Sequence, residues 1–353
     1  MRSVVRNLAI AGLAAALLAV FLRQADLGAV WQEIRRADLR LLLVAVVSVF
    51  VSLVLRTLRW QYLLAPIGRA GFGNAFRMTL VGFAATYLVP ARAGEFLRPY
   101  LLARREGFSV TATFATVVLE RVLDLLTVVL LLAAFVLWFD PGMAERNRAV
   151  YDAVRLGGLL GAATAVVLLA VMAVLAGRPD AVRRAALGLE RVLPARAAQL
   201  IARLAGLFAE GLAIARDPMR LVASLAWSIP LWLSIAFGIW TTSLAFRIAL
   251  PFPGAFLMTA MLVVGVAVPT PAAVGGFHEA YRIAATTFYA VPNDRAVGAA
   301  IVLHAVSVVP VTVAGLMCFI QEGFKLRNLG RLASTAQGED TSGEVPVLRT
   351  SRR

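Results

Sequence analysis

The sequence contains few of the residues that carry chemistry in many soluble enzymes. Among its 353 residues are one cysteine, Cys318, one lysine, Lys325, and two histidines, His278 and His304. A single cysteine excludes an intrachain disulfide and a thiolate metal cluster. The sequence has no H-E-x-x-H motif and no other His/Glu cluster with zinc spacing. It therefore predicts neither a metal site nor a cofactor.

Motifs for nucleotide and acyl chemistry are also missing. The chain has no Walker A sequence, no G-x-G-x-x-G and no G-x-S-x-G, so ATP-driven transport and serine hydrolysis gain no support. Charged residues make up only 16% of the chain, against about 25% in an average soluble protein. This low charge content argues against a soluble fold.

Long apolar runs dominate the chain instead. Hydrophobic residues make up 60% of it, and the mean hydropathy is +0.81. About 20 apolar residues cross a bilayer as a helix. We expect an all-α polytopic membrane protein, because backbone groups in lipid must be satisfied internally and no strand-like alternation is present. Full spans are predicted at 8–22, 39–57, 112–138, 154–177, 219–246 and 296–320.

The net charge of +15 comes almost entirely from arginine. Lipid headgroups explain this excess more simply than nucleic acid, because arginine gathers on cytoplasmic loops beside anionic lipid. The segment 178–218 holds seven arginines and is predicted to be a cytoplasmic amphipathic helix, or two helices broken near Pro194. We expect both termini on the cytoplasmic side of a bacterial inner membrane, with a disordered tail at 326–353. The loop 23–40 fits poorly, since its four arginines should lie outside.

Two further apolar regions, 75–103 and 255–291, contain residues that interrupt helices. Proline lacks a backbone donor, and glycine tolerates positive φ. Arginine counting places both ends of the first region on the cytoplasmic side and both ends of the second outside, so each is predicted to be a re-entrant helix pair. The predicted helix-breaking residues are Pro90, Gly94, Pro269, Pro271, Gly275 and Gly276.

The two halves of the chain overlay at a shift of 184 positions, as units 39–138 and 219–322. The aligned pairs are Glu95 with Glu279, Arg98 with Arg282, and Glu120 with His304. One span, 154–177, separates the units and inverts the second. Inverted repeats with discontinuous helices are a common plan of secondary transporters, with the binding site at the midplane. We predict such a repeat, with chance similarity as the alternative.

The stretch YLVPARAGEFLRPYLL, residues 87–102, places Arg92, Glu95 and Arg98 beside the first break. Interrupted helices present unpaired N–H groups and a positive dipole end, which attract anions. The two arginines add full positive charge, so this segment suits a phosphate or a carboxylate. The alternative is that the three side chains pair among themselves and only tie the turn together.

The stretch LERVLDLL, residues 119–126, puts Glu120, Arg121 and Asp124 inside a span. Glu120 and Asp124 share a helix face, and Arg121 can pair with Asp124. A charge at the bilayer centre costs about 2.5–3.5 kcal/mol and marks a functional candidate. The functional interpretations are proton coupling and charge balance for a headgroup-binding arginine. The alternative is a packing salt bridge between spans.

Arg56, Arg59 and Trp60 close the span at 39–57. One interpretation is an interfacial anchor, in which arginine snorkels and the aromatic ring lies at headgroup level. The other is capture of a lipid phosphate at the mouth of a cavity. The sequence leaves both open.

Four motifs occur in order: RTLRWQYLL, YLVPARAGEFLRPYLL, LERVLDLL and PTPAAVGGFHEA. Together they resemble the lysylphosphatidylglycerol synthase transmembrane-region family, also described as flippase-like integral membrane proteins, over residues 5–325. The resemblance implies a helical bundle with re-entrant segments that moves charged lipids, such as aminoacylated phosphatidylglycerol, or handles isoprenoid lipids. By that resemblance, the motif positions are Arg92, Glu95, Arg98, Glu120, Arg121, Asp124, Pro271 and Glu279.

The sequence departs from the family pattern in two ways. Ala272 and Ala273 stand where relatives often have glycines, so the second turn is expected to be less tight. We also expect no large soluble catalytic domain after the membrane part, whereas the synthase relatives carry one. Aminoacyl transfer from tRNA is therefore not expected.

We expect a lipid transporter that moves a charged phospholipid or isoprenoid-phosphate lipid through a polar cavity between the two units. The alternatives are a membrane-embedded enzyme acting on a lipid phosphate and a non-catalytic membrane partner. The expected partners are such lipids and the membrane, with homodimerisation left open. The residues expected to bind the headgroup are Arg59, Arg92, Arg98 and Arg282. The residues expected to balance charge or carry protons are Glu95, Glu120, Arg121, Asp124, Glu279 and His304.

Overall fold

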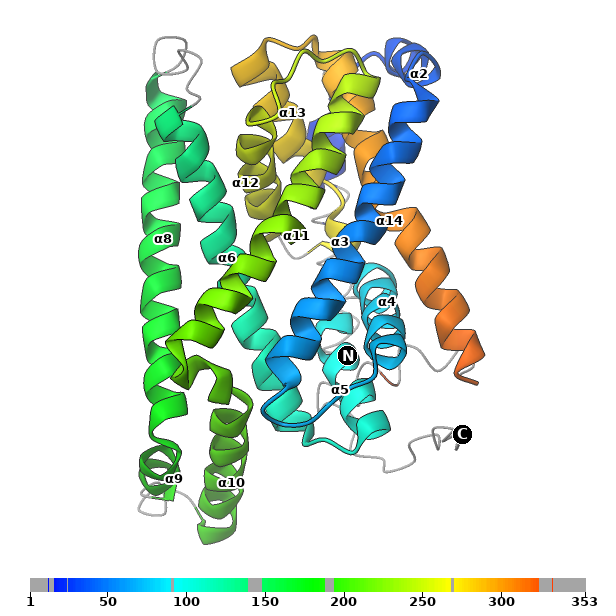
Figure 1. Ribbon diagram of the computed structural model, residues 1–353. Helices are drawn as coiled ribbons and strands as arrows, with labels where there is room; N and C mark the ends of the chain where they lie inside the picture. Colours follow the sequence, from blue (N-terminus) through cyan, green and yellow to red (C-terminus); the bar gives the residue numbers. More distant parts are fainter. Residues whose placement is uncertain are drawn as a thin grey trace.

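The protein is a bundle of helices (Figure 1). The computed structural model describes residues 12, 16–23, 25–89, 92–138, 148–187, 194–267, 270–323 and 332, and this part of the chain contains no strand. Four of its helices are long and apolar enough to cross a membrane. These four segments are Leu39–Leu64, Tyr151–Gly177, Pro218–Ala245 and Asn293–Gln321. The predicted all-α polytopic architecture is confirmed.

Five of the six predicted full spans correspond to long helices. They are α3 (Leu39–Leu64), α6 (Val110–Trp138), α8 (Arg148–Gly177), α11 (Pro218–Ala245) and α14 (Asn293–Gln321). The other predicted span, 8–22, lies partly outside the described residues, and those that are described, 12 and 16–22, are helical. The helices are longer than the charge-free runs because each continues into polar residues at one end or both.

Aspartate side chains cap the N-termini of three helices. Asp26 caps α2 (Leu27–Arg35), Asp38 caps α3 and Asp217 caps α11, each accepting a backbone N–H from two residues further along at 2.8–2.9 Å. Such a cap contributes about 1 kcal/mol by satisfying donors that the first turn leaves free. Two acids of the loop 23–40 therefore act as helix caps.

The segment 178–218 contains two helices, which is one of the two arrangements that the sequence left open. They are α9 (Pro179–Leu187) and α10 (Ala195–Gly211), followed by the short η3 (Ala213–Arg216), and Pro194 is the N-cap of α10. In Figure 1, α9 and α10 lie at the lower end of the bundle and α2 lies at the upper end. The loop 23–40 is thus at the opposite end from the segment 178–218. The predicted tail, 326–353, lies outside the described residues apart from residue 332.

Both predicted breaks are present. The first region forms α4 (Phe72–Leu88) and α5 (Gly94–Glu106), which we call hairpin 1. The second forms α12 (Gly254–Ala267), η4 (Pro271–Ala273) and α13 (Gly276–Tyr289), which we call hairpin 2. Hairpin 1 lies in the lower half of Figure 1 and hairpin 2 in the upper half.

The helices that follow the two breaks begin at glycines, whereas not every proline in these regions ends a helix. Gly94 and Gly276 are the first residues of α5 and α13, and Gly275 has a positive φ of 89°. Pro271 opens η4, whereas Pro99 lies inside α5 without ending it. The predicted helix breakers Pro90 and Pro269 lie outside the described residues.

A close backbone crossing holds each hairpin together. A Cβ on Gly94 would lie 1.9 Å from the carbonyl oxygen of Gly82, and a Cβ on Gly265 would lie 2.4 Å from that of Gly276. Both distances are far below van der Waals contact. Only glycine allows the two helices of each hairpin to approach this closely.

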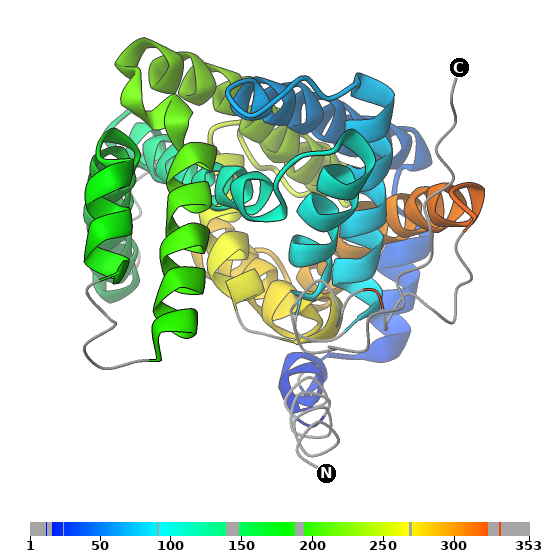
Figure 2. The same ribbon diagram turned by 90° about the horizontal axis from the view of Figure 1, so that it is seen from below.

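Each of three helices of the first predicted unit packs against a helix of the second. Helix α3 contacts α11, α4 contacts α14, and α6 contacts α12. One apolar core gathers around hairpin 2 and its neighbours, and a second gathers around hairpin 1. Seen from below, α8 and α10 lie at one edge of the bundle and α14 at the opposite edge (Figure 2). The two hairpins lie between these edges.

Candidate functional site

Two carboxylates on α6 form the centre of a buried charged cluster. Glu120 and Asp124 are four residues apart and share one face of the helix, as predicted. Their side chains are 0% and 7% exposed. Buried carboxylates need charged partners, because desolvation of an isolated charge is costly.

Arginines from two other helices supply most of those partners. Arg56 Nη1 on α3 lies 3.0 Å from both Glu120 Oε1 and Asp124 Oδ2. Arg59 Nη2, one turn further on, lies 2.8 Å from Asp124 Oδ1. Arg98 Nη1 on α5 donates to Glu120 Oε1 at 3.0 Å. The cluster therefore ties α3, α5 and α6 together.

Arg121 is the fourth arginine of this group and differs from the others in exposure. Its Nη2 donates to Glu120 Oε1 at 3.1 Å, and its Nη1 lies 3.7 Å from Asp124 Oδ2. Its side chain is 42% exposed, whereas those of the other three are at most 7% exposed. We call the six residues the α6 cluster: Arg56, Arg59, Arg98, Glu120, Arg121 and Asp124.

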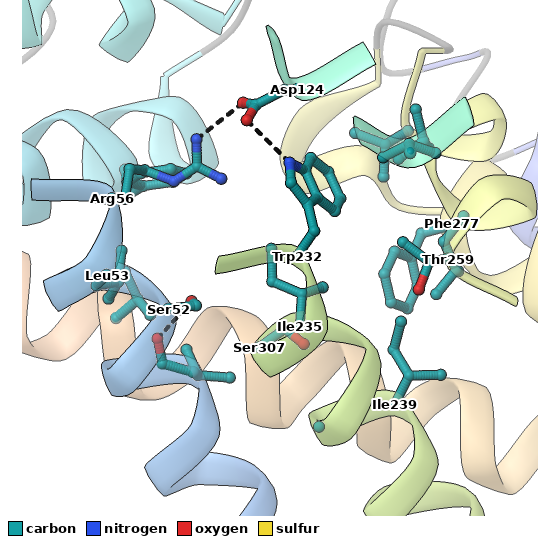
Figure 3. Close-up of a pocket in the computed structure, with 18 of the residues that line it drawn as sticks. Ser52, Leu53, Arg56, Asp124, Trp232, Ile235, Ile239, Thr259, Phe277 and Ser307 are labelled. Atoms are coloured by element: carbon teal, nitrogen blue, oxygen red, sulfur yellow. Dashed lines mark hydrogen bonds and ion pairs between the residues drawn. The ribbon is translucent and has the colours of Figure 1, made fainter. Parts of the chain in front are cut away.

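Tryptophans and a serine complete the surroundings of the α6 cluster. Trp232 on α11 donates its indole N–H to Asp124 Oδ1 at 2.9 Å (Figure 3). The guanidinium of Arg98 lies 3.8 Å from the centre of the Trp60 ring, a favourable cation–π distance. Arg59 also donates to Ser228 at 2.6 Å. Arg59 and Trp60 are fully buried, so the interfacial-anchor interpretation does not hold for them.

A cavity of about 590 Å³ adjoins the α6 cluster. Its size lies within the range of small-molecule sites, about 300–1,000 Å³. The charged residues at its wall are Arg56, Arg92, Glu95, Arg121 and Asp124. Most of the remaining wall is apolar, with side chains from both predicted units, and Figure 3 shows Ile235, Ile239 and Phe277 among them. The cavity is therefore amphipathic, with an arginine-rich part and an apolar part.

Arg92 and Glu95 reach the cavity from the break in hairpin 1. The Nη1 of Arg92 lies 3.8 Å from Glu95 Oε1, and its Nη2 donates to the carbonyl of Val266 in the last turn of α12 at 2.9 Å. Arg92 has a left-handed φ of 54°, which costs a non-glycine residue about 1 kcal/mol or more. Arg92 thus connects the two hairpins beside the cavity.

The corresponding charges of hairpin 2 lie elsewhere. Arg282 Nε donates to Glu279 Oε2 at 2.8 Å, and its Nη1 donates to Asn293 at 3.2 Å. Neither side chain contributes to the cavity wall, where hairpin 2 presents Phe277 instead. The structure does not bring Arg282 and Glu279 to the α6 cluster.

His304, aligned with Glu120 in the sequence overlay, also has a local role. Its Nε2 lies 2.7 Å from the carbonyl oxygen of Ala272 in η4. Ala272 and Ala273 both have left-handed backbones, with φ of 50° and 59°. The second turn is therefore strained rather than relaxed, because alanine takes a conformation that suits glycine.

Four predicted site residues line the cavity. Arg121 and Asp124 belong to the α6 cluster, and Arg92 and Glu95 lie beside it at the charged wall. Arg59, Arg98 and Glu120 lie behind that wall within the α6 cluster. Sequence reasoning did not select Trp232, whose indole N–H binds Asp124. A lone tryptophan within an apolar span gives no signal, because its partner is far away in the sequence.

Comparison with known proteins identifies the family of the chain. The model of the family described as lysylphosphatidylglycerol synthase TM region matches residues 5–315. A UPF0104 membrane protein of Methanothermobacter thermautotrophicus is 36% identical over 120 residues, which are 32% of this chain and 36% of the relative. A second UPF0104 membrane protein, from Methanocaldococcus jannaschii, is 34% identical over 86 residues, 24% of this chain and 25% of the relative.

A third relative carries an enzyme name. Glycosyltransferase AglD of Haloferax volcanii is 31% identical over 131 residues, which are 36% of this chain and 20% of the relative. The matched segments thus span about a third or less of these three proteins. The family match is broader, since it covers most of this chain, both hairpins included. The protein therefore belongs to the lysylphosphatidylglycerol synthase transmembrane-region family.

Proposed function

We propose that the protein moves an anionic lipid between the leaflets of a membrane, with the headgroup in the cavity beside the α6 cluster. One observation carries this proposal: the cavity joins an arginine-rich wall to an apolar wall inside a membrane bundle. Charged groups within membrane segments mark substrate pathways, because they are too costly to keep without a role. The apolar wall suits the first part of an acyl or isoprenoid chain.

The arrangement of helices supports an inverted repeat as the basis of this movement. In the first unit α4 contacts α3 and α5, and in the second α12 contacts α11 and α13. Across the units, the contact of α4 with α14 corresponds to that of α12 with α6. Inverted repeats allow one unit to rock against the other around a fixed site. Both units contribute residues to the cavity wall, which supports this mechanism.

Lipid crossing in proteoliposomes tests the proposal. A fluorescent phosphatidylglycerol is placed in both leaflets, and the fraction protected from a membrane-impermeant reductant is followed over time. We expect the wild-type protein to abolish the protected fraction well before protein-free vesicles do. Asp124→Asn should slow crossing about tenfold or more, because it removes a carboxylate from both the α6 cluster and the cavity wall.

Two further variants keep this test decisive. Arg121→Gln changes a partly exposed side chain, so it retains the fold more readily than a change at Glu120, and it should also slow crossing. Arg35→Gln changes an exposed arginine at the end of α2 and should leave the rate unchanged. Equal crossing rates in Arg121→Gln and the wild type, at equal amounts of folded protein, would exclude the proposed site.

A membrane-embedded enzyme acting on a lipid phosphate is the second candidate. It is favoured by the name of the glycosyltransferase relative and by two carboxylates, Glu95 and Asp124, at one cavity wall. Both carboxylates form ion pairs with arginine, an arrangement that suits charge balance more than proton transfer. Product formation from a lipid phosphate by the purified chain, lost in Asp124→Asn, would support this candidate.

A further inference from the structure

The charges of the α6 cluster do not balance. It contains four arginines and two carboxylates, which gives a formal excess of two positive charges. Among the described residues that form ion pairs with the cluster, no further acid is present. The other ion pair at the cavity wall, Arg92 with Glu95, adds no net charge.

The hydrogen-bonding groups show the same imbalance. Two carboxylates cannot accept from all the N–H groups of four guanidinium ions, which carry five donors each. Within the described residues, four guanidinium nitrogens of the cluster are buried without a hydrogen-bond partner, namely Nε and Nη2 of both Arg59 and Arg98, against one carboxylate oxygen, Glu120 Oε2. Glu120 Oε1 alone accepts from three of the arginines. The cluster therefore has more donors than acceptors as well as more cations than anions.

The excess charge reaches the cavity through two side chains. Arg56 and Arg121 line the cavity, whereas Arg59 and Arg98 lie behind them. A charge within a low-dielectric surrounding attracts an opposite charge more strongly than it does in water. An anion in the cavity would face the two arginines that line it, Arg56 and Arg121, and the field of the two behind them.

We propose that the site selects a dianionic phosphate, that is, a phosphomonoester or diphosphate headgroup, over a singly charged phosphodiester. This inference rests on the proposed function, and the excess of two charges is its basis. A phosphomonoester carries about −1.5 to −2 charges at pH 7, with a second pKa near 6. A phosphodiester brings one negative charge, and a headgroup that also carries an amine brings none, so neither balances the cluster.

The apolar wall assigns the phosphate to a lipid rather than to a soluble ion. The wall continues from the charged residues along α11, α12 and α14, with Ile235, Val263 and Leu303 among its members. Inorganic phosphate would leave this surface in contact with water. A lipid whose chain lies on the wall would bury it, which contributes roughly 25 cal/mol for each Å².

Binding to the purified full-length protein in nanodiscs tests the charge requirement. The probes are phosphatidic acid, a monoester, and phosphatidylglycerol, a diester, with identical acyl chains, and inorganic phosphate as the soluble source. Native mass spectrometry gives the occupancy of each. At pH 7.5 we expect phosphatidic acid to bind about tenfold more tightly than phosphatidylglycerol.

The pH dependence separates headgroup charge from headgroup shape. Below pH 6 the monoester loses its second charge, so the preference for phosphatidic acid should fall to about twofold at pH 5. The described groups that face the charged end of the cavity are Arg56, Arg92, Arg121, Glu95 and Asp124, with Tyr87 nearby. None of them is a histidine, and phosphatidylglycerol binding should therefore change little over this range.

Variants of Arg121 link the preference to the α6 cluster. Arg121→Gln lowers the excess to one charge and should reduce the preference at pH 7.5 to about threefold or less. Arg121→Lys keeps the charge and should keep the preference, which also controls for loss of folding. Arg35→Gln, on the exposed face of α2, should behave as the wild type.

The outcomes distinguish this inference from the proposed function. Equal, pH-independent binding of the two lipids, weakened in Arg121→Gln, would overturn the dianion requirement and leave anionic lipid binding intact. Binding of neither lipid at a site sensitive to Arg121 would overturn both. Inorganic phosphate that binds as tightly as phosphatidic acid, with no gain from acyl chains, would support the charge requirement and overturn the lipid assignment.

Discussion

Hairpin 1 and hairpin 2 share a close glycine crossing of the backbone, and they differ in the side chains that they present to the cavity. In each, a glycine of the first helix meets the opening glycine of the second: Gly82 with Gly94, and Gly265 with Gly276. Hairpin 1 then directs charged groups to the cavity and the α6 cluster. Hairpin 2 presents an aromatic ring there and keeps its Glu279–Arg282 pair apart.

The glycine crossings also give a different alignment of the two units. Gly82 corresponds to Gly265 at an offset of 183, and Gly94 corresponds to Gly276 at an offset of 182. In this alignment Glu95 corresponds to Phe277, and both side chains line the cavity. The two E-x-x-R sequences, which align at a shift of 184, do not overlay in this alignment of the glycine crossings. Backbone contact is a better guide to equivalence here than identical letters.

Substitutions at the two crossings should have the largest effect and should affect both hairpins alike. In Gly94→Ala the new Cβ would lie 1.9 Å from a backbone oxygen, and in Gly265→Ala it would lie 2.4 Å from one. We expect each to lower the free energy of unfolding by about 3 kcal/mol or more, because backbone cannot move aside cheaply. The midpoint of thermal unfolding in detergent measures this.

Gly73→Ala is the matched control for these variants. It lies in α4, and a Cβ there would meet nothing within 4 Å, so alanine should be neutral or slightly stabilising. An unchanged midpoint in Gly94→Ala would show that hairpin 1 does not need the close crossing.

Neutralising the same residue type in each hairpin should affect transport unequally. Glu95→Gln removes a charge from the cavity wall, and we expect lipid crossing to slow about tenfold, equivalent to about 1.4 kcal/mol. Glu279→Gln leaves the cavity wall intact, so crossing should remain within about twofold. Equal losses in both variants, with equal folded protein, would restore the functional equivalence of the two E-x-x-R sequences.

Glycine in the turn of hairpin 2 should stabilise the protein. Ala272→Gly and Ala273→Gly each relieve a left-handed alanine, and we expect a gain of about 1 kcal/mol for each. Ala163→Gly on the exposed side of α8 is the control and should lower stability by about 1 kcal/mol. Unfolding midpoints that fall in all three variants would show that the turn carries no strain.

The smallest effect on stability is expected from loss of the ion pairs between Glu33 on α2 and the arginines of the second unit. Burial raises the pKa of Glu33, but hydrogen bonds and charge from Arg295 and then Arg247 outweigh it, so the pKa lies below its ordinary value. The stabilisation is present above the ordinary value near 4.5 and is lost as pH falls through the lowered pKa.

Thermal unfolding of the wild type and Glu33→Gln between pH 7 and pH 3.5 tests this. The wild type should have the slightly higher midpoint at pH 7, and the difference should shrink at the acid end. A difference that grows on acidification would mean that the sign of the pKa shift is wrong.

Much of the fold could be predicted from the sequence, because apolar length and helix-breaking residues act locally. The breaks in both hairpins and the division of the segment 178–218 near Pro194 follow from residues within each segment. The α6 cluster was only partly predictable. Glu120 and Asp124 stand out as charges in a span, but nothing local shows that Arg56, 64 and 68 positions earlier, pairs with them.

Other parts of the site depend on contacts between distant segments. In the sequence, the part of α11 that lines the cavity does not differ from an ordinary apolar span. Trp232 becomes part of the site only because its indole N–H binds Asp124 on α6. The charges of hairpin 2 looked like those of hairpin 1 because sequence spacing records helix faces and not which face meets the cavity. Tertiary packing decides that choice.

The hydrogen bond from Arg92 to the carbonyl of Val266 has a mechanical consequence. It links the turn of hairpin 1 to the last turn of α12 in hairpin 2. This hydrogen bond must therefore break before the two units can move relative to each other. Under the proposed function, an arriving phosphate offers the same guanidinium a stronger, charged acceptor. Binding of the lipid phosphate would then break this hydrogen bond by competing with the Val266 carbonyl for Arg92. Without a bound lipid, the two hairpins would stay linked.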